Sequence, residues 1–239
     1  MDLSTRKITE ESDKLPAISG VAQQMHLITG DTYLAGLWKA SLHFELMWLQ
    51  DAAAEDFHHA RRPTTYRAPS WSWASVEGTV AFAGPFKKED IVAEVIQCEV
   101  LPVDTSNPFG AVSDGHLVIR GPLRSLDANL TPDYFHINCT DAHEVSLAKI
   151  YLDGDETLAS STAVSLSNDV LGNSQVDQRI WLLDMARNKY GDPSGYVLRQ
   201  SSQRNNLSFR RIGWFDTTTG SRDTAFWTRD TPVETITIV

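Results

Sequence analysis

The chain of 239 residues has few cysteines and no long hydrophobic run. Its two cysteines, Cys98 and Cys139, lie far apart and lack CxxC spacing, so we expect buried thiols in a reducing cytosol, with a disulfide between them as the alternative. No apolar run approaches the roughly 20 residues that span a bilayer. The polar N-terminus, MDLSTRKITEESDK, has no apolar core and is not a signal peptide or membrane anchor. We therefore expect a cytoplasmic protein with no membrane partner.

Positive charge is also scarce. The sequence has 21 Lys and Arg against 31 Asp and Glu, a net charge of −10, and its basic residues form only short pairs such as Arg61-Arg62 and Arg210-Arg211. Proteins that bind nucleic acid present a basic face, so we expect no nucleic-acid partner. The content of 41% hydrophobic and 22% charged residues is ordinary for a globular protein, and we treat residues 1–239 as a single domain.

The common catalytic signatures are missing as well. The sequence has no GxSxG, GxxxxGK[ST], GxGxxG or HExxH motif, and no paired CxxC. We therefore expect neither a cofactor nor a metal site. The segment HINCTDAHE, residues 136–144, groups His, Cys, Asp and Glu. We interpret it as a strand that runs into a polar turn, and a Cys–His nucleophilic pair is the alternative.

The N-terminal pattern predicts helices. Leu15, Ile18, Ala22 and Met25 recur at spacings of three and four, which is one face of a helix that Gly30 can end. Two further apolar clusters follow before residue 50, and we interpret them as two short helices. The sequence thus predicts a helical layer over residues 10–55.

From residue 66 onward the pattern changes to short runs rich in β-branched and aromatic residues, such as HLVIRG, RIWLLDMA and ETITIV. Turn signals such as TSNPFG and YGDPSG separate them. Such a pattern favours an antiparallel sandwich or open barrel. We predict an α+β fold in which the helical layer packs on a mainly antiparallel β-rich body, residues 66–239. The Ser- and Asn-rich segment 157–178 is expected to be either a long loop over a site or a mobile segment.

The stretch YRAPSWSWASVEG contains two tryptophans, Trp71 and Trp73. In an extended strand, alternation places both rings on one face, where they can meet Trp38 and Trp48 of the helical layer. Each ring would bury ~150–250 Å² in a core between helices and sheet. The alternative is that some of these rings line a ligand cavity.

Three segments in this order, DKLPAISG, YLAGLW and YRAPSWSWAS, carry a family likeness. Together with CEVLPV, GHLVIRGPL and FRRIGWFD they resemble the segment that follows the HET domain in fungal heterokaryon-incompatibility proteins. The likeness covers most of the chain. The motifs of the HET domain are not found in these 239 residues, so the resemblance implies a β-rich C-terminal module and not the cell-death activity assigned to that domain.

Two classes of function fit these observations. The first is a cofactor-independent cyclase or isomerase, such as a pericyclase of the Diels–Alder type, that acts on a hydrophobic polyketide- or terpene-like small molecule in fungal secondary metabolism. Such an enzyme needs a shaped cavity and one or two hydrogen-bond donors to a substrate carbonyl. The alternative is a non-enzymatic interaction or regulatory module derived from a heterokaryon-incompatibility protein, which predicts an exposed apolar patch and no enclosed cavity.

We predict that the site of such an enzyme lies between the helical layer and the sheet. His43 interrupts an apolar helix face, where a polar side chain needs a partner, although it could also be a core histidine. Tyr66 and Arg67 belong to the tryptophan stretch, where a structural role is the alternative. The predicted catalytic donors are His43, Tyr66 and Arg67, and the predicted substrate-binding residues are Trp38, Met47, Trp48, Trp71 and Trp73.

Overall fold

The structure, a computed structural model, describes residues 10–51, 54, 61–127, 136–141, 144–153, 179–188, 191–201, 208–217 and 231–239. The expectation for the segment 157–178 lies outside these residues.

The first described elements are two short helical turns and one α-helix. The 3-10 helices Glu11–Asp13 and Pro16–Ile18 lead into α1 (Ser19–Thr29). Gly30 ends α1 in the left-handed conformation, φ 68°, and its N–H donates to the His26 carbonyl over 2.7 Å. Leu15, Ile18 and Ala22 are buried as predicted, whereas Met25 is exposed.

The prediction of two short helices after α1 is wrong for most of that segment. The structure has a hairpin instead, β1 (Tyr33–Leu34) and β2 (Leu37–Trp38), because Ala35 and Gly36 both adopt positive φ, 49° and 97°. This backbone is the two-residue turn that joins tight hairpins, and glycine makes it accessible. The 3-10 helix Lys39–Ser41, the one-turn helix α2 (Leu42–Glu45) and β3 (Trp48–Gln50) complete the N-terminal layer.

The rest of the described chain is mainly β. A short strand, β4 (Val80–Phe82), pairs with β3. One large sheet has the order β10-β9-β6-β12-β11-β8-β7, β5 also pairs with β6, and β10 also pairs with β11. Its strands are β5 (Glu94–Pro102), β6 (Val112–Asp127), β7 (His136–Asp141), β8 (Glu144–Leu152), β9 (Arg179–Arg187), β10 (Pro193–Gln200), β11 (Ser208–Thr217) and β12 (Val233–Ile238).

The pairings confirm a β-rich α+β fold. All are antiparallel except β11 with β12, so the sheet is mixed. The strand predicted at the start of HINCTDAHE is β7. Cys98 on β5 is a free, half-buried thiol, and burial raises its pKa to about 12, as expected of an unreactive cysteine.

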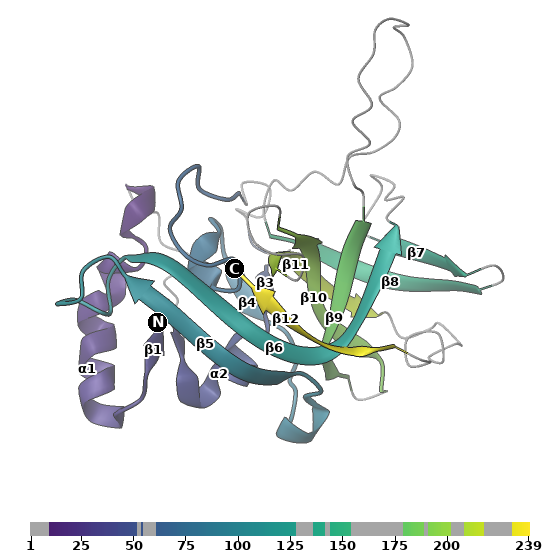
Figure 1. The fold of residues 1–239 in the computed structure, drawn as a ribbon, viewed down its shortest axis with the longest axis horizontal. Coiled ribbons are helices and arrows are strands. Elements are labelled where there is room, and N and C mark those ends of the chain that lie inside the picture. The colour runs from purple at the N-terminus through teal and green to yellow at the C-terminus, as the bar shows by residue number, and fades with distance from the viewer. Residues whose placement is uncertain are drawn as a thin grey trace, which may run out of the picture.

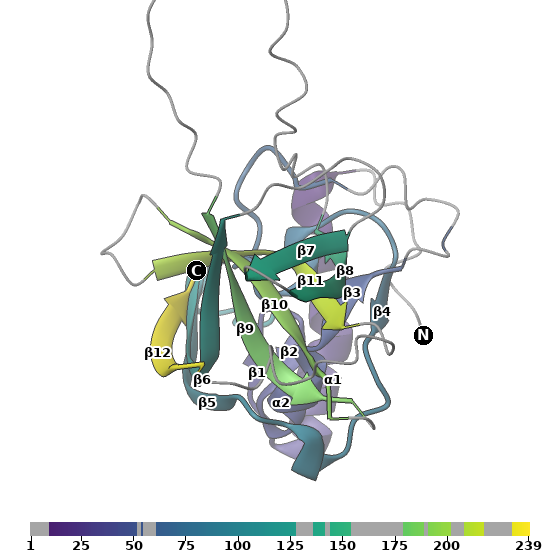
Figure 2. The ribbon, with the colours of Figure 1, turned by 90° about the vertical axis from the view of Figure 1, so that its right-hand side faces the viewer.

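The N-terminal elements gather at one end of the molecule. In Figure 1 α1, β1 and α2 lie at the left under the long β5–β6 hairpin, and β7 and β8 lie at the opposite end. In Figure 2 the same N-terminal elements lie behind β9 and β10. Leu15, Leu37 and Leu46 of this layer share one core cluster with Leu117 and Tyr196 of the sheet.

A buried carboxylate on β9 links stability to pH. Asp184 is 4% exposed, accepts a hydrogen bond of 2.9 Å from Arg187 Nη2, and burial raises its pKa to about 6 from 3.8. The folded state therefore binds this proton more tightly than the unfolded state does. The contribution of the proton to stability is full below about pH 4 and is lost as the pH rises through about 6.

We expect Asp184→Asn to remove this dependence. Relative to the variant, the wild-type protein should lose about 2 kcal/mol of unfolding free energy between pH 4 and pH 7. Urea denaturation across this range measures the difference, and Glu89→Gln, at an exposed carboxylate, is the control. A difference between wild type and Asp184→Asn that stays constant with pH would contradict this prediction.

Candidate functional site

The tryptophan stretch is a turn followed by a short helix, so the predicted extended strand is wrong. The 3-10 helix Trp73–Ser75 begins at Ser72, whose Oγ accepts from the Ala74 N–H over 3.1 Å and donates to the Ala35 carbonyl over 2.6 Å. A serine that caps a helical turn in this way competes with strand formation. Trp71 is fully buried as predicted, and Trp73 is half-buried.

A fully buried arginine on β11 joins the N-terminal layer to the sheet. The Arg211 guanidinium carbon lies 3.5 Å from the centre of the Trp48 ring and 4.5 Å from that of Tyr196. Its Nε donates to Asp153 Oδ2 over 2.8 Å and its Nη2 to the Trp48 carbonyl over 2.6 Å. The Tyr196 hydroxyl and Arg211 Nη1 both donate to the Leu46 carbonyl. The stacked rings and these hydrogen bonds hold the charge inside the protein.

Asp153 is shared with a second arginine. Arg62 Nη2 lies 3.3 Å from Asp153 Oδ2 and donates to the Arg211 carbonyl over 2.6 Å, while Arg62 Nη1 donates to Ser75 Oγ over 3.0 Å. The side chain of Arg62 is 8% exposed, and those of Asp153 and Arg211 are not exposed at all. Both guanidinium groups thus share the carboxylate of Asp153.

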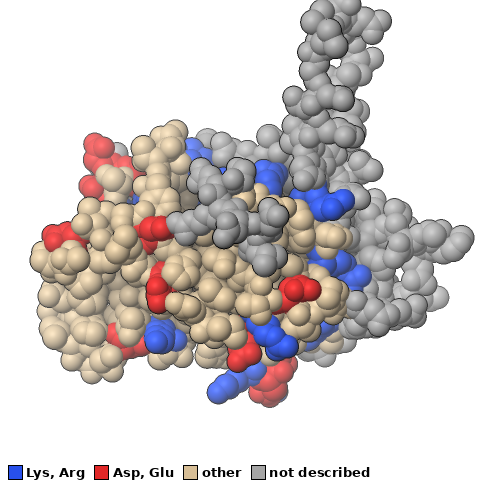
Figure 3. Space-filling view, in the orientation of Figure 1, with Lys and Arg blue, Asp and Glu red and all other residues tan. Residues whose placement is uncertain are grey.

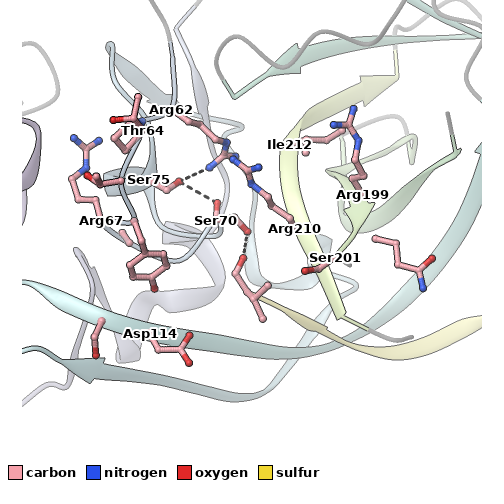
Figure 4. Close-up of a pocket in the computed structure, with 17 residues that line it drawn as sticks. Arg62, Thr64, Arg67, Ser70, Ser75, Asp114, Arg199, Ser201, Arg210 and Ile212 are labelled. Atoms are coloured by element: carbon pink, nitrogen blue, oxygen red, sulfur yellow. Dashed lines mark hydrogen bonds between the residues drawn. The ribbon is translucent and has the colours of Figure 1, made fainter. Parts of the chain in front are cut away.

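A cavity of about 770 Å³ opens beside Arg62 (Figure 4). One wall is the segment 62–68 with Ser70 and Ser75, another is the start of β6, and a third combines the end of β10 with β11 and Val239. The charged residues of its lining are Arg62, Arg67, Arg199, Arg210 and Asp114. This volume is in the range of roughly 300–1,000 Å³ typical of small-molecule sites, and the lining is rich in hydrogen-bond donors.

Two of the eight predicted site residues, Tyr66 and Arg67, line this cavity. Tyr66 is 55% exposed. The Arg67 guanidinium, in contrast, donates to the carbonyls of Ala74 (2.6 Å), Val76 (2.9 Å) and Glu11 (2.7 Å) and pairs with Glu77. These bonds use four of its five N–H donors, so Arg67 fixes the cavity wall and is not a donor to a substrate.

The other six predicted residues lie away from the cavity. Met47, Trp48 and Trp71 are fully enclosed by neighbouring side chains, and Trp38 and Trp73 are half-buried against the core. His43 is half-buried and its ring centre lies 4.3 Å from that of Phe44. The structure therefore does not bring the eight residues together at one cavity.

The sequence reasoning missed the arginines of the opposite wall. Arg199 and Arg210 come from different strands, and the register that makes them neighbours is not visible in either segment alone. One signal was present in the pair Arg210-Arg211. In a strand, consecutive side chains point to opposite faces, so one of the two had to be directed inward.

Neither a metal centre nor a membrane-spanning helix is found in the part of the chain that the structure describes. No group of three or more His, Cys, Asp or Glu side chains there is placed to hold a metal ion. No helix there has the length and apolar character needed to cross a bilayer. Comparison of the sequence and structure with protein-family models, curated proteins and solved structures finds no match.

Proposed function

We propose that the protein is a cofactor-independent cyclase or isomerase, of the pericyclase type, that binds a polyketide- or terpene-like molecule in the cavity beside Arg62. The observation that carries this proposal is the cavity of about 770 Å³. A site of this size suits a compact natural product, whereas a module that only contacts another protein needs no such cavity. We assign the activity to fungal secondary metabolism in the cytoplasm. The binding partner that we propose is the small-molecule substrate.

The chemistry of ring closure fits a chain without a cofactor motif. In a Diels–Alder closure, three π bonds of the substrate become two σ bonds and one π bond, and no atom is gained or lost. The catalyst has to hold the reacting ends together and to donate a hydrogen bond to a carbonyl that activates one of them. Tyr66 is the donor that we propose, because it lines the cavity and 55% of its surface is exposed.

The polar lining changes the substrate that we expect. Apolar surface is contributed by Pro63, Ala68 and Ile212, but arginines and hydroxyl side chains supply much of the rest. A purely hydrocarbon substrate would leave these donors without partners, at a cost of about 1–3 kcal/mol for each buried group. The favoured substrate therefore has several oxygen atoms beside its unsaturated chain.

We also infer a barrel rather than a sandwich. The pairings β10–β9, β9–β6, β6–β12, β12–β11 and β11–β10 return to the strand from which they start, which supports this inference. The cavity includes the end of β10 and part of β11, two neighbours in this ring. The mouths of β-barrels are frequent sites for small ligands, so the inferred barrel and the proposed site support each other.

The test uses the full chain and an extract of a strain that lacks its gene. Incubation should convert one metabolite into a product of the same mass, detected by liquid chromatography and mass spectrometry. We expect Tyr66→Phe to slow the conversion by roughly 100-fold, since it removes the hydrogen-bond donor to the substrate carbonyl. Tyr151→Phe, on β8 outside the cavity lining, is the control. An unchanged metabolite profile after gene deletion, with no conversion in vitro, would refute the proposed enzymatic activity.

One observation favours the second candidate, an interaction module. On α1, Val21 is 64% exposed, Leu27 70% and Ile28 78%. Exposed apolar side chains close together often mark a surface that binds another protein. If no isomer forms, and a pull-down returns a stable partner that is lost with Val21→Ser and Ile28→Ser, the interaction module replaces the enzyme.

A further inference from the structure

We propose that the protein forms a reversible homodimer through α1, in which the helices of two copies pack antiparallel about a twofold axis near Gln24. This inference goes beyond the proposed function, because it assigns an occupant to the exposed face of α1 rather than a ligand to the cavity. No residue of α1 lines the cavity, so the dimer does not depend on the proposed chemistry.

The attachment of α1 to the rest of the protein is the first observation. A surface helix normally directs its apolar stripe toward the core. In α1, however, Ala22 is the one buried hydrophobic residue, and beside it the half-buried His26 ring lies with its centre 5.3 Å from that of Phe109. The helix is therefore attached by a small residue and a polar one.

The larger apolar residues of α1 form a stripe on its outer side. Val21, Met25 and Ile28 are 64%, 43% and 78% exposed. Their spacing of four and three residues places them on one face of an α-helix, over two turns. Gln24 and Leu27, of which Leu27 is 70% exposed, flank this stripe. Such a stripe can pack against another helix, because its side chains form a ridge along the helix surface.

Charge is missing from this region. Residues 15–30 contain no Asp, Glu, Lys or Arg, although 22% of the chain is charged. In Figure 3 the surface at the lower left, where Figure 1 places α1, is mostly tan. Depletion of charged residues is a compositional mark of the core of a protein interface. A membrane does not fit this face, since helices that lie on a bilayer carry Lys and Arg beside their apolar stripe.

The net charge of the chain limits where two copies can meet. Each copy carries a net charge of −10, so two copies repel one another over most orientations. Close packing is least opposed where neither copy presents charge, and residues 15–30 are such a region. Because a twofold axis brings the same patch of both copies together, this one uncharged face supplies both sides of the interface.

The face is also complementary to itself. In an antiparallel pair centred between Gln24 and Met25, Val21 of each copy lies opposite Ile28 of the other, and the two Gln24 side chains meet beside the axis. An amide both donates and accepts hydrogen bonds, so one Gln24 can satisfy the other. The positive N-terminal end of each helix then lies beside the negative C-terminal end of the other. These features favour a second copy over an unlike protein.

The size of the face sets the expected affinity. A standard interface buries roughly 800 Å² of each partner. The 11 residues of α1 extend over only about 16 Å, so the helix pair alone buries less than that. Interfaces below the standard size are typical of transient association, and we therefore expect a Kd of about 10–100 μM.

Sedimentation velocity of the full chain from about 1 to 300 μM, at physiological salt, tests the dimer. The sedimentation coefficient should rise from that of a monomer toward that of a dimer. We expect Val21→Glu and Ile28→Lys each to raise the Kd more than about tenfold, because a charge in this apolar contact has no partner. Val233→Lys, at a 50% exposed valine on β12, is the control and should leave the Kd unchanged. Thermal melting verifies that each variant is folded.

A mixture of two variants tests the antiparallel geometry. In a mixed dimer of Val21→Glu with Ile28→Lys, the introduced carboxylate lies opposite the introduced ammonium group, while the second contact between Val21 and Ile28 stays apolar. The mixture should therefore associate at concentrations at which each variant alone is a monomer. A mixture that associates no better than its components would overturn the antiparallel packing.

The remaining outcomes separate the dimer from the two candidate functions. A monomer up to about 300 μM, or a Val233→Lys effect as large as that of Ile28→Lys, would overturn the homodimer. An unlike protein captured on α1 by a chain that itself stays monomeric would also overturn it, in favour of the interaction module. Tyr66→Phe should keep the wild-type Kd, so failure of the enzyme and failure of the dimer are distinct results.

Discussion

Replacement of Asp153 by asparagine is expected to lower the free energy of unfolding by about 3–5 kcal/mol, the cost of breaking a buried ion pair. Asn has nearly the same shape as Asp, so the packing changes little. The charge that offsets Arg62 and Arg211 is lost, however, and both guanidinium groups are almost completely buried. Urea denaturation at neutral pH measures the change.

A double variant and a surface control make this result specific. In Asp153→Asn combined with Arg211→Met, the guanidinium group that pairs with Asp153 is also removed, so the double variant should be less destabilised than the sum of the single variants. Glu94→Gln, at an exposed carboxylate on β5, should change the stability by less than about 0.5 kcal/mol. Additive single effects would show that the two side chains are not energetically coupled and would contradict the shared charge.

Trp71→Ala is expected to lower the free energy of unfolding by about 3–5 kcal/mol, because the whole ring is buried in the core. Its Nε1 has no hydrogen-bond partner among the described residues, so the loss is one of packing. Trp73→Ala should cost less, because Trp73 is only half-buried, although its Nε1 donates to the Gly36 carbonyl over 2.9 Å.

Two phenylalanine variants separate the contribution of ring packing from that of a hydrogen bond. Trp71→Phe removes part of the ring but no hydrogen bond, whereas Trp48→Phe also removes the bond of 2.8 Å from Trp48 Nε1 to the Trp71 carbonyl. We therefore expect Trp48→Phe to be the more destabilising, by about 1 kcal/mol. Thermal and urea denaturation of the four variants give the order. Equal effects of Trp71→Ala and Trp73→Ala would contradict the difference in burial.

The sequence predicts those parts of the fold that depend on local patterns. Gly30 ends α1, and the β-branched runs after residue 90 form strands, because backbone conformation and burial of one face are encoded within each segment. The hairpin at Ala35 and Gly36 was missed, since leucine and tryptophan spacing on either side also fits a helix. The two-residue turn with positive φ at Ala35 and Gly36 determines the local structure, whatever the spacing of the apolar residues.

The cavity is harder to predict than the strands. Arg67 looks like a binding residue in the sequence, and only its contacts with Ala74, Val76 and Glu11 reveal that it supports the wall. Arg199 and Arg210 become neighbours through the pairing of β10 with β11, which is a tertiary property. The sequence correctly places the bulky rings of Trp48 and Trp71 in the core. Their packing encloses them fully, however, so they do not line the cavity.

The hydrogen bonds of Arg211 also bear on how the protein is made. Its bond to the Trp48 carbonyl joins residues 163 positions apart, and the bond between Arg62 and the Arg211 carbonyl spans 149 positions. During synthesis, at roughly 5–20 residues per second, the N-terminal layer therefore emerges many seconds before its charged partner on β11 does. Contacts this distant in the chain slow folding, because a long loop must close before they form. The Trp48 ring, on which the Arg211 guanidinium stacks, thus lacks this partner until β11 has left the ribosome.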